Sequence, residues 1–246
     1  EFATSLYDGS AKATGQFNVR TQPATYQANS QITGIHIQPL LVALANNDKL
    51  EGKGNLTVNV QGKGLTETHI KKNMKGKVGV ALTDGAVKGI NLAQLIRTNY
   101  AKFKGQTLTE AEKVQKTDFG SLTSTFNLAD GVATTNDLKL MSPLLRVNAA
   151  GDADYIKQTL NFHVDTSVVG SLEGQGGKTI DELKDVTIPV KITGPWEKLK
   201  YRLDFNGVLK QKAKKELDRG LEKLDGKIKN EKAKEAVNQL LKGLFK

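Results

Sequence analysis

The chain has 246 residues, 38% hydrophobic and 6% aromatic side chains, and a formal net charge of +10. It contains no cysteine, which excludes disulfides, thiol catalysis and thiolate metal sites. Residues 207–246 hold 12 Lys and Arg against 6 Asp and Glu. Much of the basic character therefore belongs to the C-terminal segment, and a general nucleic-acid-binding surface is not implied.

The sequence predicts no membrane-spanning helix, because no run of about 18 apolar residues occurs. No signal peptide is visible, and Glu1-Phe2 is typical of a cloning scar. We therefore expect the chain to be an excised fragment of a longer protein.

Two stretches of the chain, residues 32–41 and 87–96, have nearly the same pattern. Each has an apolar residue, a spacer, a Gly-Ile pair, an alternating apolar residue and then two apolar side chains at helical spacing. This pattern predicts a strand that ends in a short helix, used twice. Pro39 suits a helix start, and Asn91 with Gln94 suits an N-cap. Such repetition is more typical of stacked units than of a pocket enzyme.

Most of residues 5–206 alternates between apolar and polar side chains, which predicts half-buried antiparallel strands. Turn signals at 84–85, 130–131, 151–152 and 194–195 separate these strands. Further helices are predicted over 66–75 and 107–116, and a loop over 171–183. The apolar sets are Leu56, Val58 and Val60; Val78, Val80 and Leu82; Phe126 and Leu128; Leu138 and Leu140; Leu145, Val147 and Ala149; Leu160, Phe162 and Val164; Ile188, Val190 and Ile192; and Tyr201, Leu203 and Phe205.

From residue 207 onward the apolar period changes to that of a helix. Leu217, Leu221, Leu224 and Ile228 share one stripe, and lysines fill the gaps. This pattern predicts a basic amphipathic helical tail that contacts an anionic membrane surface or caps the sheet. The lysines assigned to membrane contact are Lys214, Lys215, Lys223 and Lys227.

No pattern in the sequence predicts catalysis, a metal or a cofactor. The three histidines have no second ligand at metal spacing, and no G-x-S-x-G turn occurs. The stretch 174–179 lacks the first glycine of a phosphate-binding loop. Asp152 and Asp154 flank a predicted turn, where solvated carboxylates are expected. A hydrolase is the weakest hypothesis, because no nucleophile–base pair is visible.

A sheet with one apolar face must bury that face against something. Periodicity alone leaves two alternatives: the face fills its own core, or it lines a groove for acyl chains. The residues expected to point inward as the lining are Leu56, Val58, Val60, Val80, Leu82, Phe162, Val190 and Leu203.

Four blocks of the sequence resemble the AsmA family. They are residues 82–92 (LTDGAVKGINL), 130–147 (DGVATTNDLKLMSPLLRV), 151–162 (GDADYIKQTLNF) and 188–196 (IPVKITGPW). The resemblance covers roughly residues 50–210.

The resemblance implies a periplasmic region of a Gram-negative envelope protein whose inner-membrane anchor is absent from this chain. It also implies kinship with TamB and the chorein-type bridge proteins, which look like repeated β-sheets curled into an apolar trough. Those proteins are implicated in phospholipid movement, and AsmA itself in outer-membrane assembly. The family offers no catalytic residues to carry over.

The combined prediction is an α+β, mostly β fold: a curled antiparallel sheet over residues 1–206 and a basic helical tail over 207–246. The first functional hypothesis is a non-enzymatic envelope protein that handles phospholipid in an apolar β-groove. The alternative is a scaffold with a filled core that assists outer-membrane protein assembly through an envelope partner.

Deleting residues 211–246 tests the tail. Each lysine near an anionic surface contributes about 1 kcal/mol, so we expect the full chain to sediment with anionic phospholipid vesicles, less so as salt rises. The truncated chain should stay folded and unbound. Equal sedimentation of both chains, or of neither, would leave the tail as a cap of the sheet.

Overall fold

The computed structural model describes residues 2–106, 114–169, 183, 186–208 and 210. The chain divides into two units, Glu1–Asp204 and Phe205–Lys246. In the second unit, residues 205–208 form a helical turn. The four lysines assigned to membrane contact lie outside the described residues.

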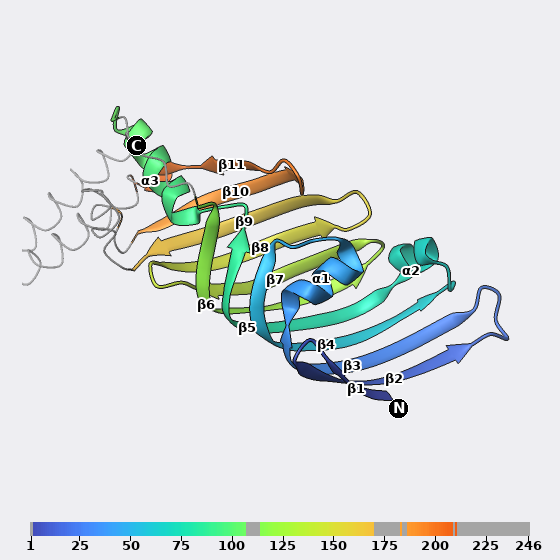
Figure 1. Cartoon of the computed structure of the whole chain (residues 1–246). Coiled ribbons are helices and arrows are strands. Elements are labelled where there is room, and N and C mark those ends of the chain that lie inside the picture. Colours follow the sequence, from blue (N-terminus) through green and yellow to red (C-terminus); the bar gives the residue numbers. More distant parts are fainter. Residues whose placement is uncertain (1, 107–113, 170–182, 184–185, 209, 211–246) are drawn as a thin grey trace, which may run out of the picture. The chain divides into compact units, whose positions relative to one another are not determined.

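The first unit is one antiparallel sheet of eleven strands whose spatial order equals their order in the sequence (Figure 1). Among the described strands β1 pairs with β2 alone and β11 with β10 alone, so the sheet is open. The predicted mostly β, curled antiparallel sheet is confirmed. The strands are β1 Phe2–Leu6, β2 Gly9–Asn18, β3 Thr25–His36, β4 Leu50–Lys63, β5 Lys75–Lys88, β6 Lys116–Ala129, β7 Val132–Met141, β8 Leu145–Asp154, β9 Thr159–Val168, β10 Thr187–Pro195 and β11 Lys200–Leu203.

Three helices lie between strands and define two ends of the sheet. Helices α1 (Ile37–Ala45) and α3 (Leu92–Phe103) join β3 to β4 and β5 to β6, at the end we call the helix end. Helix α2 (Glu67–Asn73) and the short turns after β2, β6, β8 and β10 lie at the opposite, hairpin end. The expected helix over 66–75 is thus confirmed.

The predicted repeat is present as the units β3–α1 and β5–α3. In both units the Gly of the Gly-Ile pair has a positive φ, 69° at Gly34 and 87° at Gly89, where a side chain would be strained. The predicted cap is also present, since the Asn91 side chain accepts a hydrogen bond from the Gln94 backbone N–H at 2.9 Å.

Several local predictions were wrong. Asp84-Gly85 and Gly151-Asp152 lie inside β5 and β8 rather than in turns. Asp84 takes a positive φ of 49° within its strand, and Gly151 pairs directly with Phe162. Dipeptides that favour turns also suit bulges and close strand contacts, so the sequence signal is ambiguous.

Phe205 was expected to continue the last strand, but β11 ends at Leu203. Residue 205 begins the helical turn of the second unit. The helix predicted over 107–116 and the loop predicted over 171–183 fall mostly outside the described residues.

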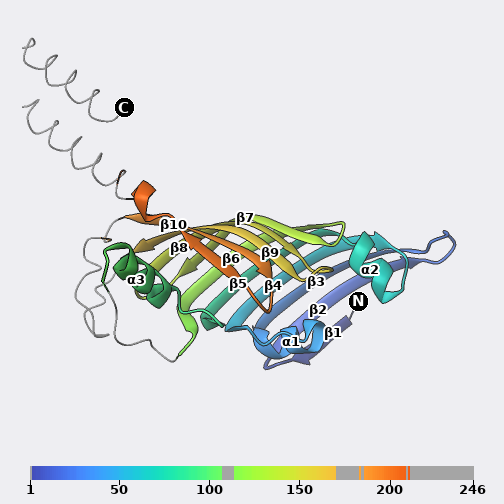
Figure 2. The same ribbon diagram turned by 90° about the horizontal axis from the view of Figure 1, so that it is seen from above.

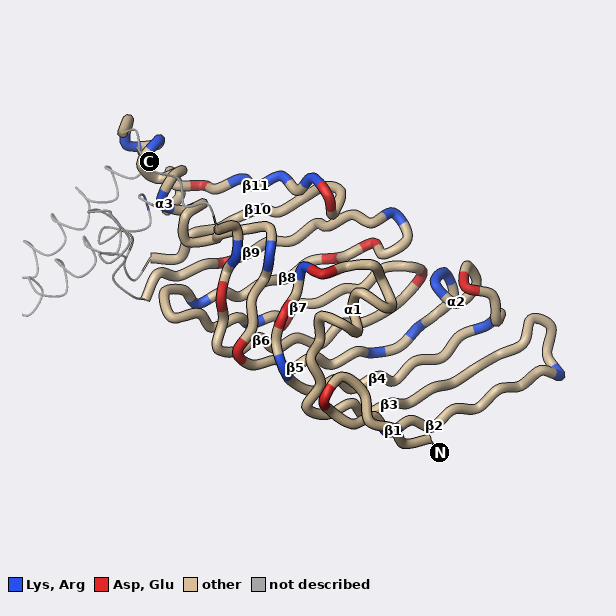
Figure 3. The backbone as a smooth tube through the Cα atoms, in the orientation of Figure 1, with Lys and Arg blue, Asp and Glu red and all other residues tan. Residues whose placement is uncertain are grey.

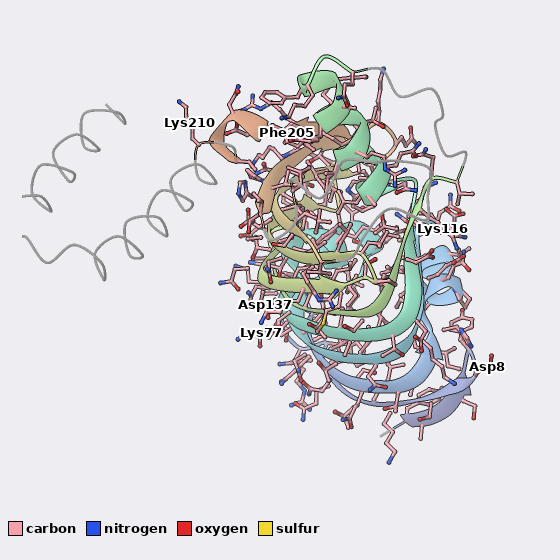
Figure 4. All side chains as sticks on the ribbon, turned by 90° about the vertical axis from the view of Figure 1, so that its left-hand side faces the viewer. Asp8, Lys77, Lys116, Asp137, Phe205 and Lys210 are labelled. Carbon is pink, nitrogen blue, oxygen red and sulfur yellow. The ribbon has the colours of Figure 1, made fainter. Side chains whose placement is uncertain are left out.

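The strands bend near the helix end. Register shifts occur in β3 between Ile32 and Ile35 and in β4 between Glu51 and Lys53, and β5 carries the positive φ of Asp84 beside them. Such irregularities in neighbouring strands bend a sheet and increase its twist. Figure 4 shows the resulting curvature, with Lys77 and Asp137 on its convex side.

The core is concentrated at the helix end. The fully buried side chains include Leu82 late in β5, Leu145 at the start of β8, Ile188 at the start of β10 and Ile96 of α3. Helix α3 lies along this end (Figure 2) and buries Leu92, Ile96 and Tyr100, which are spaced four residues apart. This half of the apolar face is therefore filled.

Truncation of Leu82, which is 1% exposed, should remove packing that the core cannot replace. We expect Leu82→Ala to lower the free energy of unfolding by about 2–5 kcal/mol. Val80→Ala on the same strand should cost clearly less, because Val80 is half-buried. Urea denaturation of both variants measures the difference, and equal losses would contradict a core concentrated at the helix end.

Candidate functional site

One face of the sheet is apolar from β2 to β11. Residues directly paired across antiparallel strands share a face. Leu56 pairs with Ile32 on one side and Val80 on the other, and Val190 pairs with Val164 and Leu203. We call this surface the apolar face.

All eight residues predicted as lining lie on the apolar face, and none is exposed. Leu56, Val60, Leu82 and Val190 are buried, with exposed fractions from 0% to 9%. The other four, Val58, Val80, Phe162 and Leu203, are half-buried. The structure thus brings them together along one surface.

The apolar face is incompletely covered toward the hairpin end. Beside the half-buried lining residues already named, Val78, Phe126, Leu128 and Ile192 also keep part of their surface in solvent. These side chains come from strands β4, β5, β6, β9, β10 and β11. We call this half-exposed part the trough lining. It is concave, because the convex side of the bent strands carries Lys77 and Asp137 (Figure 4).

The opposite face is polar. Along β4 the exposed residues Asn55, Thr57, Asn59 and Gln61 alternate with the apolar residues of the trough. A sheet with this alternation normally packs its apolar face on a second layer and leaves the other in water. Here the second layer reaches only the helix end, so the trough lining remains available to an apolar ligand.

A small polar cluster interrupts the apolar face. The hydroxyls of Ser124 and Thr135, both 5% exposed, lie 2.9 Å apart. The Thr135 hydroxyl also donates to the Asp137 carboxylate at 2.9 Å, and the Thr125 backbone N–H donates to the same oxygen at 2.8 Å. The β6–β7 and β7–β8 registers both shift here. The Asp137 carboxylate therefore replaces the strand partner that the Thr125 backbone N–H would otherwise have on β7.

This cluster favours the ionised form of the Asp137 carboxyl. The backbone N–H of Thr125, and then the Thr135 hydroxyl, hold the pKa of the Asp137 carboxyl below its ordinary value. Sequence patterns did not predict the cluster, because Ser124 and Thr135 lie where the alternation leads one to expect apolar side chains.

The remaining candidate residues lie apart from one another. His36 is 3.6 Å from Asp8 and His163 is 3.5 Å from Asp165, and all four side chains are largely exposed. Within the described ranges, no three His, Cys, Asp or Glu side chains gather as a metal site.

Asp154 closes the β8–β9 turn. Its carboxylate accepts hydrogen bonds from the backbone N–H groups of Lys157 and, less strongly, Ile156, and these lower the pKa of this carboxyl. Asp152 instead accepts a hydrogen bond from the Asn161 amide. The two carboxylates thus serve local structure.

Helices of the described residues are too short or too polar to cross a membrane. These features define a class of protein built on an open, bent, single-layer sheet, in which other side chains cover only part of the apolar face. Sequence comparison places this class in a family.

The profile of the AsmA family matches residues 1–138, so the chain belongs to the AsmA family. Its members are proteins of the cell envelope. The chain is also 28% identical over 228 residues to Protein AsmA of Escherichia coli (strain K12). The matched region covers 89% of this chain and 37% of that protein. No solved structure matches. The chain thus spans little more than a third of the curated relative.

The depressed pKa of Asp137 predicts a pH effect. Its contribution to stability is present above the ordinary Asp pKa of about 3.9 and is lost as pH falls through the lower folded-state value. We expect the urea midpoint of the wild type to fall more steeply below about pH 4 than that of Asp137→Asn, whose amide does not titrate. Parallel curves would show that the carboxylate charge contributes nothing.

Proposed function

We propose that the chain holds the acyl chains of phospholipid along its trough lining and so supports lipid transport and outer-membrane assembly. The observation that carries this proposal is the half-exposed apolar surface of Val58, Val80 and Phe162 and their neighbours. Covering apolar surface gains about 25 cal/mol per Å². Flexible hydrocarbon chains suit such a surface, because it is long, shallow and built mostly from aliphatic side chains.

Family membership supports the location in this proposal. The chain acts in the periplasm as part of a protein anchored in the inner membrane, and its partners are phospholipid, a membrane surface reached through residues 207–246 and an envelope protein. The proposed function requires no catalysis, metal or cofactor, because it consists of binding acyl chains and shielding them from water.

A second function has its own support. The filled core at the helix end, with Ile188 and Val190 both 0% exposed, suits a rigid scaffold that assists outer-membrane protein assembly. The two functions differ in what occupies the trough lining. A scaffold needs no lipid there, whereas a lipid carrier purifies with lipid bound.

The deciding measurement is organic extraction of the purified chain followed by mass spectrometry of the extract. The lipid proposal predicts phospholipid in near-constant ratio to protein. A folded chain that carries no lipid and takes up none from vesicles would favour the scaffold.

Adjacent residues of β5 give a matched pair of variants. Val80 belongs to the trough lining and Ala81 to the polar face, where it is exposed. A carboxylate against hydrocarbon costs more than about 1.4 kcal/mol, so Val80→Asp should retain about tenfold less lipid, or still less. Ala81→Asp should retain lipid as the wild type does.

Circular dichroism and urea midpoints of the two variants serve as the control for folding. A loss of lipid in both variants, or in neither, would contradict binding on the apolar face.

A further inference from the structure

The polar face of β2–β5 has an unusual composition. We call the outward-facing residues of 12–18, 25–31, 55–63 and 75–81 the amide face. Its side chains are Asn, Gln, Thr and Lys with small residues between them, and it contains no Asp or Glu. In Figure 3 this stretch of the four strands carries blue segments but no red ones.

Carboxamides form rows across the strands of the amide face. Gln16 pairs with Gln27, Gln27 with Gln61, and Gln61 with Lys75. One step along the strands, Asn29 pairs with Asn59 and Asn59 with Lys77. Neighbouring rows therefore lie about 7 Å apart and neighbouring members of a row about 5 Å apart.

These polar groups are available to a ligand. Gln16, Gln27, Gln61 and Lys77 are exposed, and no described protein group forms a hydrogen bond or ion pair with their side chains. Lys75 has one distant partner, Asp130, at 3.7 Å. The row from Gln16 to Lys75 also borders a hollow of about 520 Å³.

A second hollow, of about 270 Å³, lies farther along the same face. Asn55, Thr57, Gly79 and Ala81 border it on β4 and β5, and on the side of β6 and β7 it reaches Thr125 and the Asp137 carboxylate, which lies outside the amide face. The space beside Gly79 is taken by Thr57, whose hydroxyl oxygen would lie 2.5 Å from a Cβ at this position. Of the two hollows, the one beside the row from Gln16 to Lys75 therefore suits an anion better, because no carboxylate lines it.

The other half of the polar face provides a contrast. On β7–β9 the outward residues mix both signs of charge, including Asp137, Lys139, Arg146 and Asp165. Mixed charge is ordinary for a solvated sheet face. A face with cations and amides but no carboxylate attracts an anion and offers it both donors and acceptors.

From these observations we propose that the amide face binds an anionic glycan chain. Sugar hydroxyls need partners that both donate and accept, which carboxamides provide. The lysines supply attraction for carboxylate or phosphate groups on the chain. The amide face lies on the side of the sheet opposite the trough lining. A glycan on the amide face and a lipid on the trough lining therefore bind independently of each other.

The test is affinity electrophoresis of the 246-residue chain through gels that contain polygalacturonate, neutral dextran or inorganic polyphosphate. We expect polygalacturonate to retard the wild type more than either of the others. The double variant Gln27→Ala/Gln61→Ala keeps the charge but removes two amides, and should bind polygalacturonate about tenfold more weakly. Lys77→Gln should also weaken binding.

Asn148→Ala is the matched control, since this exposed amide lies on the polar face of β8. It should bind as the wild type does. The basic segment 211–246 is present in every variant, so differences between variants report on the sheet alone.

Several outcomes would overturn the proposal. One is a double variant that binds polygalacturonate as tightly as the wild type. Another is equal retardation by polyphosphate, which would indicate charge attraction alone. A third is loss of anionic-vesicle binding in Lys77→Gln with unchanged glycan binding, which would make the surface a membrane contact.

Discussion

A single-layer sheet with one apolar face must cover that face, and this constraint governs the whole first unit. Strands alone cannot satisfy it, because every inward residue of β4 or β9 needs neighbours above as well as beside it. The chain covers the helix end by bending its strands and laying α3 against them. Toward the hairpin end the same apolar pattern continues without full cover. The boundary between filled core and trough lining is therefore set by where α3 lies, since α2 at the hairpin end buries none of its side chains.

Much of this arrangement could be predicted from the sequence because period-2 alternation is strong from Leu56 onward. The eight lining residues fall on one face, since alternation and antiparallel pairing together fix the side of the sheet. Strands β1–β3 were harder to recognise, because Ala11, Ala13 and Gly15 occupy inward positions where larger apolar residues would give a clear signal. Small residues suffice there, near the edge of the sheet.

Other features could not be predicted because their cause is tertiary. Asp84 has the sequence signature of a turn, and only its neighbours in β4 and β6 show that the strand continues through it. The Ser124–Thr135–Asp137 cluster depends on register shifts in two strand pairs, which no local pattern encodes. The amide face, by contrast, is visible in the sequence as alternating Asn and Gln, but its rows need the pairing register to be recognised.

The strand order, which follows the sequence without a crossover, has a consequence for how such a chain can change. Each strand hydrogen-bonds to its immediate neighbours in the sequence. Stability then accumulates strand by strand, as in solenoid proteins, rather than through one central nucleus. Insertion or loss of a hairpin would alter the length of the sheet and leave distant strands untouched. The length of the trough is consequently a property that evolution or design can tune in two-strand steps while the cross-section stays the same.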